Sequence, residues 1–217
     1  ENPLSYWLAS LFLYFLLLHP SDTSTFSLRR ISVFFLIASL AFFNRQDTIL
    51  LYIPLLLYLL FLNIRQRPVT LPLIVFLSIL PATVWFVFSF FYYGSPFPNT
   101  AYAKSFSSGL DLSYKINAGL QYGFSSLSQD PINHALIFGS FAWTLIRKDK
   151  PAVFMMLGVL LYYTYIITTA AAATHMGGRF FSVPFFISTL IFVYYCQHNI
   201  ARLLTVVILV VVAMINP

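Results

Sequence analysis

Long apolar runs alternate with short polar stretches along most of the chain. Dividing the sequence at its charges and prolines gives about eight apolar ranges, and a helix needs about 20 such residues to cross hydrocarbon. The ranges are 3–18, 29–43, 48–63, 69–92, 132–146, 152–173, 180–196 and 202–216. The second, fifth and eighth are short by that measure. The pattern predicts an all-α, polytopic bundle of transmembrane helices, with Pro54, Pro81 and Pro184 tolerated inside ranges as kinks.

The segment 93–131 interrupts this pattern because it is rich in Ser, Gly and Asn. Within it, apolar residues recur every four positions, at Leu112, Ile116, Leu120 and Phe124. This spacing is typical of a short amphipathic helix that lies on a membrane surface. We therefore expect one longer extracytoplasmic loop with an interfacial helix inside a single transmembrane domain over 1–217.

Composition supports the membrane prediction. Hydrophobic residues make up 59% of the chain and charged residues 8%, with a mean hydropathy of +0.83. Soluble domains carry about 25% charged residues, so this chain has too few polar groups to cover a soluble fold. The net charge of +6 falls in short clusters between apolar runs. This is not the basic face that a nucleic-acid-binding protein needs.

The basic residues also predict the orientation in the membrane. If the ranges cross in turn, one set of connections holds Arg29, Arg30, Arg65, Arg67, Arg147, Lys148, Lys150 and Arg202. The other set holds Arg45, Lys104, Lys115 and Arg179. The positive-inside rule places the larger set in the cytoplasm. The turns with the most distinctive polar residues are then expected together on the opposite face.

Arg45 and Asp47 occupy the first of these turns, between two apolar ranges. Ionisable groups near membrane depth are costly and usually have a partner or a function. The planar guanidinium of Arg45 suits phosphate oxygens. Asp47 could hold that arginine, coordinate a cation or accept a proton, and a local ion pair in a tight interfacial turn is an equally good interpretation.

The second turn follows Tyr93 and contains Pro96 and Pro98. Two prolines so close together exclude a regular helix there. A fixed turn of this kind can present polar side chains to a ligand, and the candidates for substrate binding are Tyr93, Asn99, Thr100 and Lys104.

The third turn contains His175, two glycines and Arg179. Glycines let backbone amides approach an anion, and the start of the next helix offers unpaired N–H groups to it. His175 and Arg179 are therefore candidates for binding a phosphate or phosphosugar, and the alternative is a flexible turn with an arginine that reaches the interface.

The sequence offers no ligand set for a metal. His19, His134 and His198 lack metal-binding spacing, and polar positions at a membrane interface account for them. One cysteine, Cys196, excludes an internal disulfide and a cysteine metal site. No cofactor is predicted, although a divalent metal is compatible with the class of enzyme considered next.

Several of these stretches together resemble a known family. They are Glu1-Asn2-Pro3-Leu4, Arg45-Gln46-Asp47, Tyr92-Tyr93-Gly94, Pro98-Asn99-Thr100, Ala103-Lys104 and Gly178-Arg179-Phe180-Phe181 with Pro184. In this order they resemble integral membrane glycosyltransferases of the GT-C type. The likeness is greatest to the terminal arabinofuranosyltransferases of the mycobacterial cell wall and their uncharacterised bacterial relatives.

The resemblance implies an enzyme of the bacterial plasma membrane that is active on its outer face. It implies a polyprenyl-phosphate-linked sugar donor, arabinofuranose-like or mannose-like, and a glycan or lipid acceptor. A carboxylate in the first outer loop acts as the general base in such enzymes, and that loop would precede Glu1 in a longer protein. Within this chain Asp47 and Glu1 are the catalytic candidates, and Arg45, Lys104 and Arg179 are expected to neutralise the donor phosphate.

One departure from the family keeps other functions open. The relatives carry a Gly-Gly-Asp-x-Met-x-x-Arg turn, whose acidic residue is replaced here by Thr174. His175 could take over its polar role, or the substrate could differ. The departure also fits an inactive accessory subunit of a cell-envelope assembly. A transporter or lipid flippase is the other alternative, although such proteins often show repeats that this sequence lacks.

Overall fold

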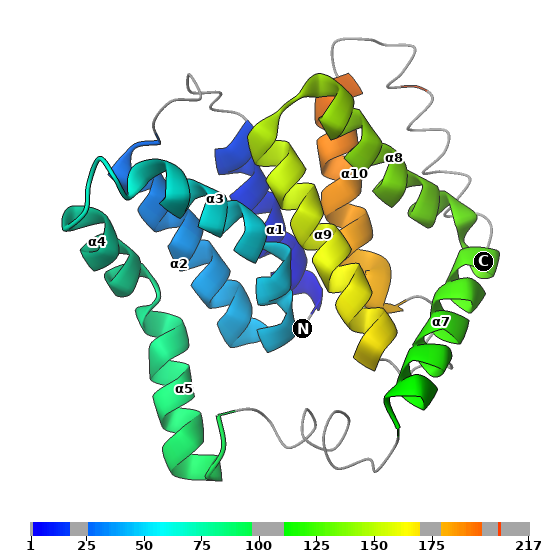
Figure 1. Cartoon of the computed structure of the whole chain (residues 1–217), viewed down its shortest axis with the longest axis horizontal. Helices are drawn as coiled ribbons and strands as arrows, with labels where there is room; N and C mark the ends of the chain where they lie inside the picture. The colour runs from blue at the N-terminus through cyan, green and yellow to red at the C-terminus, as the bar shows by residue number, and fades with distance from the viewer. Residues whose placement is uncertain (1, 18–25, 97–110, 170–178, 197–203, 205–217) are drawn as a thin grey trace. The chain divides into compact units, whose positions relative to one another are not determined.

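The computed structural model describes residues 2–17, 26–96, 111–169, 179–196 and 204. These residues form helices and contain no strand, so the all-α prediction is confirmed (Figure 1). The chain divides into two compact units, residues 1–109 (unit 1) and 110–217 (unit 2).

Unit 1 is built around one central helix. Its elements are α1 (Asn2–Leu17), α2 (Leu28–Asn44), the 3₁₀ helix η1 (Gln46–Leu51), α3 (Ile53–Asn63), α4 (Thr70–Ser78) and α5 (Leu80–Tyr93). Helix α2 contacts each of the other five. The rings of Phe12, Phe34 and Tyr52 join α1, α2 and the start of α3, with centroids 4.8 Å (Phe12–Phe34) and 4.6 Å (Phe12–Tyr52) apart. These rings are fully buried and form the core of the unit.

The predicted range 69–92 is two helices, because α4 and α5 meet at an angle of 54°. Pro81 has no backbone N–H and its ring crowds the preceding turn, so the helix cannot continue unbroken through it. Two serines on the same face of α2 make hydrogen bonds to polar groups on both sides of this break. Ser39 Oγ accepts a hydrogen bond from the Ala82 amide at 2.9 Å, and Ser32 Oγ lies 2.9 Å from Ser78 Oγ.

The other two prolines predicted to make kinks also lie near the starts of helices. Pro54 follows Ile53 at the start of α3, and Pro184 is the third residue of α10 (Ser182–Cys196). A proline in the first helical turn removes no intrahelical hydrogen bond. The prediction that these residues kink continuous helices is therefore wrong, and they mark helix starts.

One end of unit 1 gathers basic residues that were predicted to face the cytoplasm. The Arg30 guanidinium donates to the carbonyls of Phe15 (from Nε, 3.0 Å) and Leu16 (3.3 Å), which belong to the last turn of α1. Arg67 Nη1 donates to the Phe26 carbonyl at 3.3 Å, just before α2 begins. Both arginines therefore satisfy backbone groups at the same end, where α1 ends and α2 starts.

Unit 2 contains α7 (Leu112–Gln129), α8 (Pro131–Arg147), α9 (Lys150–Thr169), the 3₁₀ turn η2 (Arg179–Phe181) and α10. Helices α8, α9 and α10 contact one another, and α7 lies against α9. An added Cβ at Gly119 of α7 would lie 1.5 Å from the carbonyl oxygen of Ile167 on α9. Only glycine therefore allows the two backbones to approach this closely.

Helix α7 corresponds to the amphipathic helix predicted inside 93–131. It has 18 residues and is longer than predicted. Its Ala118 and Tyr122 are buried, so one face packs on α9 within the unit. Its location on a membrane surface stays a prediction.

Charged residues also gather at the end of the α8–α10 bundle where α8 and α10 end and α9 begins. Arg147 lies over the rings of Trp143 and Tyr195, with its Cζ 5.7 and 6.0 Å from their centroids. The Tyr195 hydroxyl donates to Asp149 Oδ2 at 2.7 Å, and Asp149 Oδ1 accepts from the Ala152 amide at 3.2 Å, which caps α9. These contacts connect the α8–α9 corner to the end of α10.

One described helix is long and apolar enough to cross a membrane, namely residues 150–168 of α9, and α4 with α5 would make a second if the bent pair forms one span. The described parts of the other predicted ranges form helices, but these are shorter. Range 202–216 lies outside the described residues apart from Leu204.

Candidate functional site

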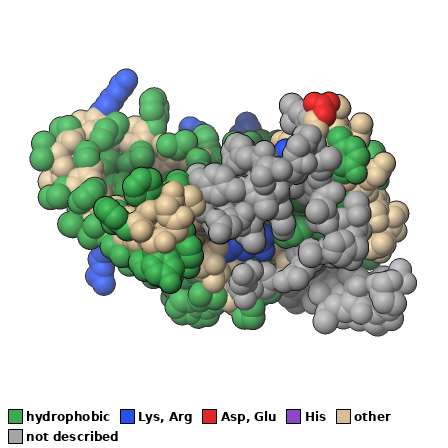
Figure 2. Space-filling view, turned by 90° about the horizontal axis from the view of Figure 1, so that it is seen from below, with side chains coloured by type: hydrophobic (Ala, Val, Ile, Leu, Met, Phe, Trp, Pro, Cys, Tyr) green, Lys and Arg blue, Asp and Glu red, His purple; other side chains and the backbone are tan. Residues whose placement is uncertain are grey.

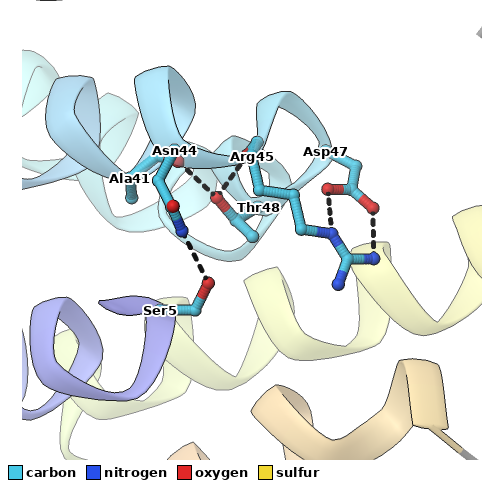
Figure 3. A network of polar contacts seen from close by, with 6 residues as sticks. All are labelled: Ser5, Ala41, Asn44, Arg45, Asp47 and Thr48. Atoms are coloured by element: carbon cyan, nitrogen blue, oxygen red, sulfur yellow. Dashed lines mark hydrogen bonds and ion pairs between the residues drawn. The ribbon is translucent and has the colours of Figure 1, made fainter. Parts of the chain in front are cut away.

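The Asn44–Thr48 turn is held in place by its own backbone and by one hydroxyl. Arg45 is extended (φ −157°, ψ 109°), ends α2 and precedes η1. Its amide donates to the Ala41 carbonyl at 2.9 Å, and its carbonyl accepts from the Thr48 amide at 3.1 Å. The buried Thr48 hydroxyl lies 2.6 Å from the Arg45 carbonyl and 3.0 Å from that of Ala41 (Figure 3). The turn is therefore fixed on both sides of Arg45.

Arg45 and Asp47 form a two-point ion pair. Arg45 Nε donates to Asp47 Oδ1 and Arg45 Nη2 to Oδ2, each at 2.8 Å (Figure 3). Their side chains are 17% and 18% exposed. Bidentate guanidinium–carboxylate pairs are stronger and more directional than single contacts. Of the three roles considered for Asp47, the observed contact is the one that holds Arg45.

The same end of unit 1 contains two further polar contributions. Asn44 Nδ2 donates to the buried Ser5 Oγ at 3.1 Å, which joins the end of α2 to the start of α1. Helix α5 runs parallel to α2, since Phe86 stacks on Phe42 at 5.2 Å and Ala82 contacts Ser39. Tyr93, the last residue of α5, therefore lies toward the same end as Arg45.

Tyr93 is exposed, and its ring packs on aromatic neighbours of the same helix. Its centroid lies 4.8 Å from that of Tyr92 and 6.3 Å from that of Phe88. Gly94 then ends α5 in the left-handed region (φ 68°), which suits glycine. The structure thus brings the predicted residues Arg45, Asp47 and Tyr93 to one end of unit 1 without a direct contact between Tyr93 and the ion pair.

The remaining predicted site residues are described only in part. Glu1, Asn99, Thr100, Lys104 and His175 lie outside the described residues, as does Thr174. For Arg179 the backbone is described, and it opens the 3₁₀ turn η2 before α10.

The turn that carries Arg179 is held by three helices of unit 2. The Phe180 amide donates to the Tyr122 hydroxyl on α7 at 3.3 Å. The Phe181 ring lies among Tyr122, Tyr163 of α9 and His134 of α8, with centroids 5.5, 4.5 and 5.2 Å away. We name Tyr122, His134 and Tyr163 the Phe181 cage.

Polar contacts hold the cage itself. His134 is 2% exposed, with Nε2 3.0 Å from Ser126 Oγ and Nδ1 3.1 Å from the Tyr163 hydroxyl. A neutral imidazole offers one donor and one acceptor, and hydroxyls can take either role. Burial raises the pKa of the Tyr122 phenol, and the hydrogen bond from the Phe180 amide opposes that shift, so the phenol stays protonated at neutral pH.

Sequence reasoning missed this cluster. It assigned His134 to a membrane interface as an ordinary polar residue, whereas the structure buries it. The available signal was a histidine near the start of range 132–146 together with hydroxyl groups in neighbouring segments, at Ser126 and Tyr163. Only the packing of the helices brings these groups together.

Within residues 2–17, 26–96, 111–169, 179–196 and 204, no three His, Cys, Asp or Glu side chains come together. Divalent cations require several oxygen ligands, and Asp47 already has both oxygens on Arg45. The ion pair by itself therefore lacks the set of ligands that a metal centre needs.

Compared with protein-family models, curated proteins and solved structures, the chain matches none of them. The likeness to GT-C-type glycosyltransferases stays a prediction from sequence motifs.

Proposed function

We propose that this chain is a membrane glycosyltransferase that transfers an arabinofuranose-like or mannose-like sugar from polyprenyl phosphate to a cell-envelope glycan or lipid. The acceptor hydroxyl oxygen attacks the anomeric carbon as the bond to the phosphate oxygen breaks. The configuration at the anomeric carbon is inverted, polyprenyl phosphate leaves, and the hydroxyl proton passes to a carboxylate base.

The observation that carries the proposal is the separation of charges within each unit. In unit 1, Arg30 and Arg67 lie where α1 ends, and the Arg45–Asp47 pair lies at the opposite end of α2. In unit 2, Arg147 and the α8–α9 corner lie at the end of α10, and Arg179 lies before its start. This fits helices that cross a membrane, with stop signals on one side and substrate contacts on the other.

Exposed apolar side chains support a lipid environment. Helices α4 and α5 leave large hydrophobic residues exposed along their length, and Phe91 is 82% exposed. Figure 2, seen from below, shows hydrophobic side chains over much of the surface formed by the described residues. Soluble proteins rarely expose contiguous apolar patches of this kind. We propose that α4 and α5 form one broken span within a polytopic bundle of about eight helices in the bacterial plasma membrane.

Arg45 is proposed to contact the donor phosphate. Its guanidinium is fixed by Asp47 and by the rigid turn, so little conformational freedom is lost when it stabilises a leaving phosphate. Because both oxygens of Asp47 accept from Arg45, we assign Asp47 to positioning that arginine. Glu1 is then the candidate base within this chain. Arg179 is proposed separately as a substrate contact in unit 2, with Tyr93, Asn99, Thr100, Lys104 and His175 as further candidates.

The test is a transfer assay with the full-length protein in liposomes. The donors are polyprenyl-phospho-arabinofuranose and polyprenyl-phospho-mannose labelled in the sugar, with a cell-envelope glycan as acceptor and no ion gradient. Label in the glycan and release of polyprenyl phosphate support the proposal. Label that changes leaflet without leaving the lipid indicates a flippase, and an unchanged donor in both leaflets indicates an accessory subunit.

A further inference from the structure

We propose that the Phe181 cage positions the backbone turn that carries Arg179, so that Tyr122, His134 and Tyr163 act on substrate binding only through that turn. This inference rests on the proposed role of Arg179 as a substrate contact. The three cage residues are positioning residues, because none of them is assigned a contact with substrate.

The geometry distinguishes this turn from an ordinary connection before a helix. Residues 179–181 form only a short 3₁₀ turn, and so few residues cannot fix their own position. Three rings from three helices surround Phe181, and the Phe180 amide donates to the Tyr122 hydroxyl on α7. The position of the turn is therefore set by α7, α8 and α9 together.

The cage is also rigid in itself. His134 is bonded to side chains on both of its nitrogens, from Ser126 on α7 and Tyr163 on α9. Tyr163 in turn stacks on Phe181 with planes 26° apart. A change in how α7, α8 and α9 pack therefore reaches the Arg179 turn through Phe181.

A positioned contact is sensitive to small displacements. A shift of about 1 Å in a group that positions a substrate can cost about 10²-fold in rate. A cage that fixes residues 179–181 would thus affect turnover without touching the substrate. A cage that only fills the core would affect stability alone.

The experiment removes one oxygen from the cage. Tyr122→Phe keeps the ring beside Phe181 and deletes the acceptor of the Phe180 amide hydrogen bond. Tyr114→Phe is the matched control, because Tyr114 lies on the same helix and is exposed. Amide hydrogen exchange over residues 179–183 is measured in the full-length protein, and donor kcat/KM is measured in the transfer assay.

We expect exchange over 179–183 to be about fivefold faster in Tyr122→Phe, as for loss of one hydrogen bond, and unchanged in Tyr114→Phe. We expect kcat/KM for the donor to fall about tenfold in the wild-type background. In an Arg179→Lys background the same change should add no further loss, because residues that act as a unit are not additive.

Three results would overturn the proposal: unchanged exchange in Tyr122→Phe, an equal loss of kcat/KM in both backgrounds, or faster exchange with unaltered kcat/KM. Failure of the proposed function appears differently. Full activity of Arg179→Ala would contradict the substrate contact itself, and the exchange rates do not depend on that contact.

Discussion

The Arg45–Asp47 pair of unit 1 and the Phe181 cage of unit 2 are held in opposite ways. In unit 1, Arg45 and Asp47 are two positions apart and lie in one short turn. In unit 2, the groups around Phe181 come from α7, α8 and α9, and Phe180 and Tyr122 are 58 positions apart. A local pair is fixed by the turn that contains it, whereas the Phe181 cage exists only when three helices have packed. Substitutions at the ion pair should therefore act locally, and substitutions at the cage should act on the packing of α7, α8 and α9.

The largest expected effect is at the centre of the cage. Phe181→Ala should lower the free energy of unfolding by about 3–5 kcal/mol, because it leaves a cavity among three rings. Denaturant titration of the purified protein in mixed micelles measures this. Phe91→Ala, at an exposed position, should change it by less than about 0.5 kcal/mol. Equal effects of the two changes would show that Phe181 is not a packing centre.

Next in size is the contact between α7 and α9. Gly119→Ala should cost about 3 kcal/mol, because its Cβ would overlap the Ile167 carbonyl and force the helices apart. Gly123→Ala on the same helix meets nothing within 4 Å and should stabilise the protein by about 0.5–1 kcal/mol. Denaturant titration should show a lower free energy of unfolding for Gly119→Ala and a higher one for Gly123→Ala. A loss at both positions would mean that helix propensity or backbone conformation, rather than the close approach, controls this region.

In unit 1, breaking the ion pair should cost less. Arg45→Gln and Asp47→Asn should each lower the unfolding free energy by about 2 kcal/mol, because each leaves a largely buried partner without its two-point contact. The double variant should cost clearly less than the sum of the two. Arg29→Gln, at an exposed position, is the control. Strict additivity would mean that the pair makes no coupled contribution.

The smallest expected effect concerns the break between α4 and α5. Ser39→Ala should cost about 1 kcal/mol, because the Ala82 amide loses its acceptor. Ser10→Ala is matched in chemistry, since Ser10 Oγ donates to the Tyr6 carbonyl of its own helix and its loss orphans no amide. A larger loss for Ser10→Ala than for Ser39→Ala would remove the compensating role assigned to Ser39.

The sequence predicted the helices well because the apolar ranges end at charges and prolines. Both ends of α2 and α8 and the C-terminal end of α5 lie within about two residues of the predicted ranges, the scale on which helix ends are defined. The Arg45–Asp47 turn was also predictable, since both partners lie in one polar stretch between two helices. The contact that Asp47 makes could not be predicted, because an ion pair, a cation site and a proton acceptor would all use the same two residues.

The Phe181 cage could not be predicted, since periodicity gives the faces of a helix but not the neighbour that each face meets. His134 occupies an apolar range and has no metal-binding spacing, so its sequence context indicated an interface. Its burial depends on how α8 is rotated against α7 and α9. Pro54 was misread for a related reason, because the unbroken apolar run 48–63 hides the boundary between η1 and α3.

The most direct test of the central claim measures donor turnover by three single-arginine variants. Arg45→Gln and Arg179→Gln should each lower kcat/KM for polyprenyl-phospho-sugar by about 10²–10³-fold, the usual cost of removing a positioned charge contact. Arg29→Gln, at the opposite end of α2 from Arg45, should leave it unchanged. Rates are normalised to folded protein, so the stability loss of Arg45→Gln does not enter. Near-normal turnover by Arg45→Gln would contradict the role proposed for the ion pair and, with it, the function proposed for unit 1.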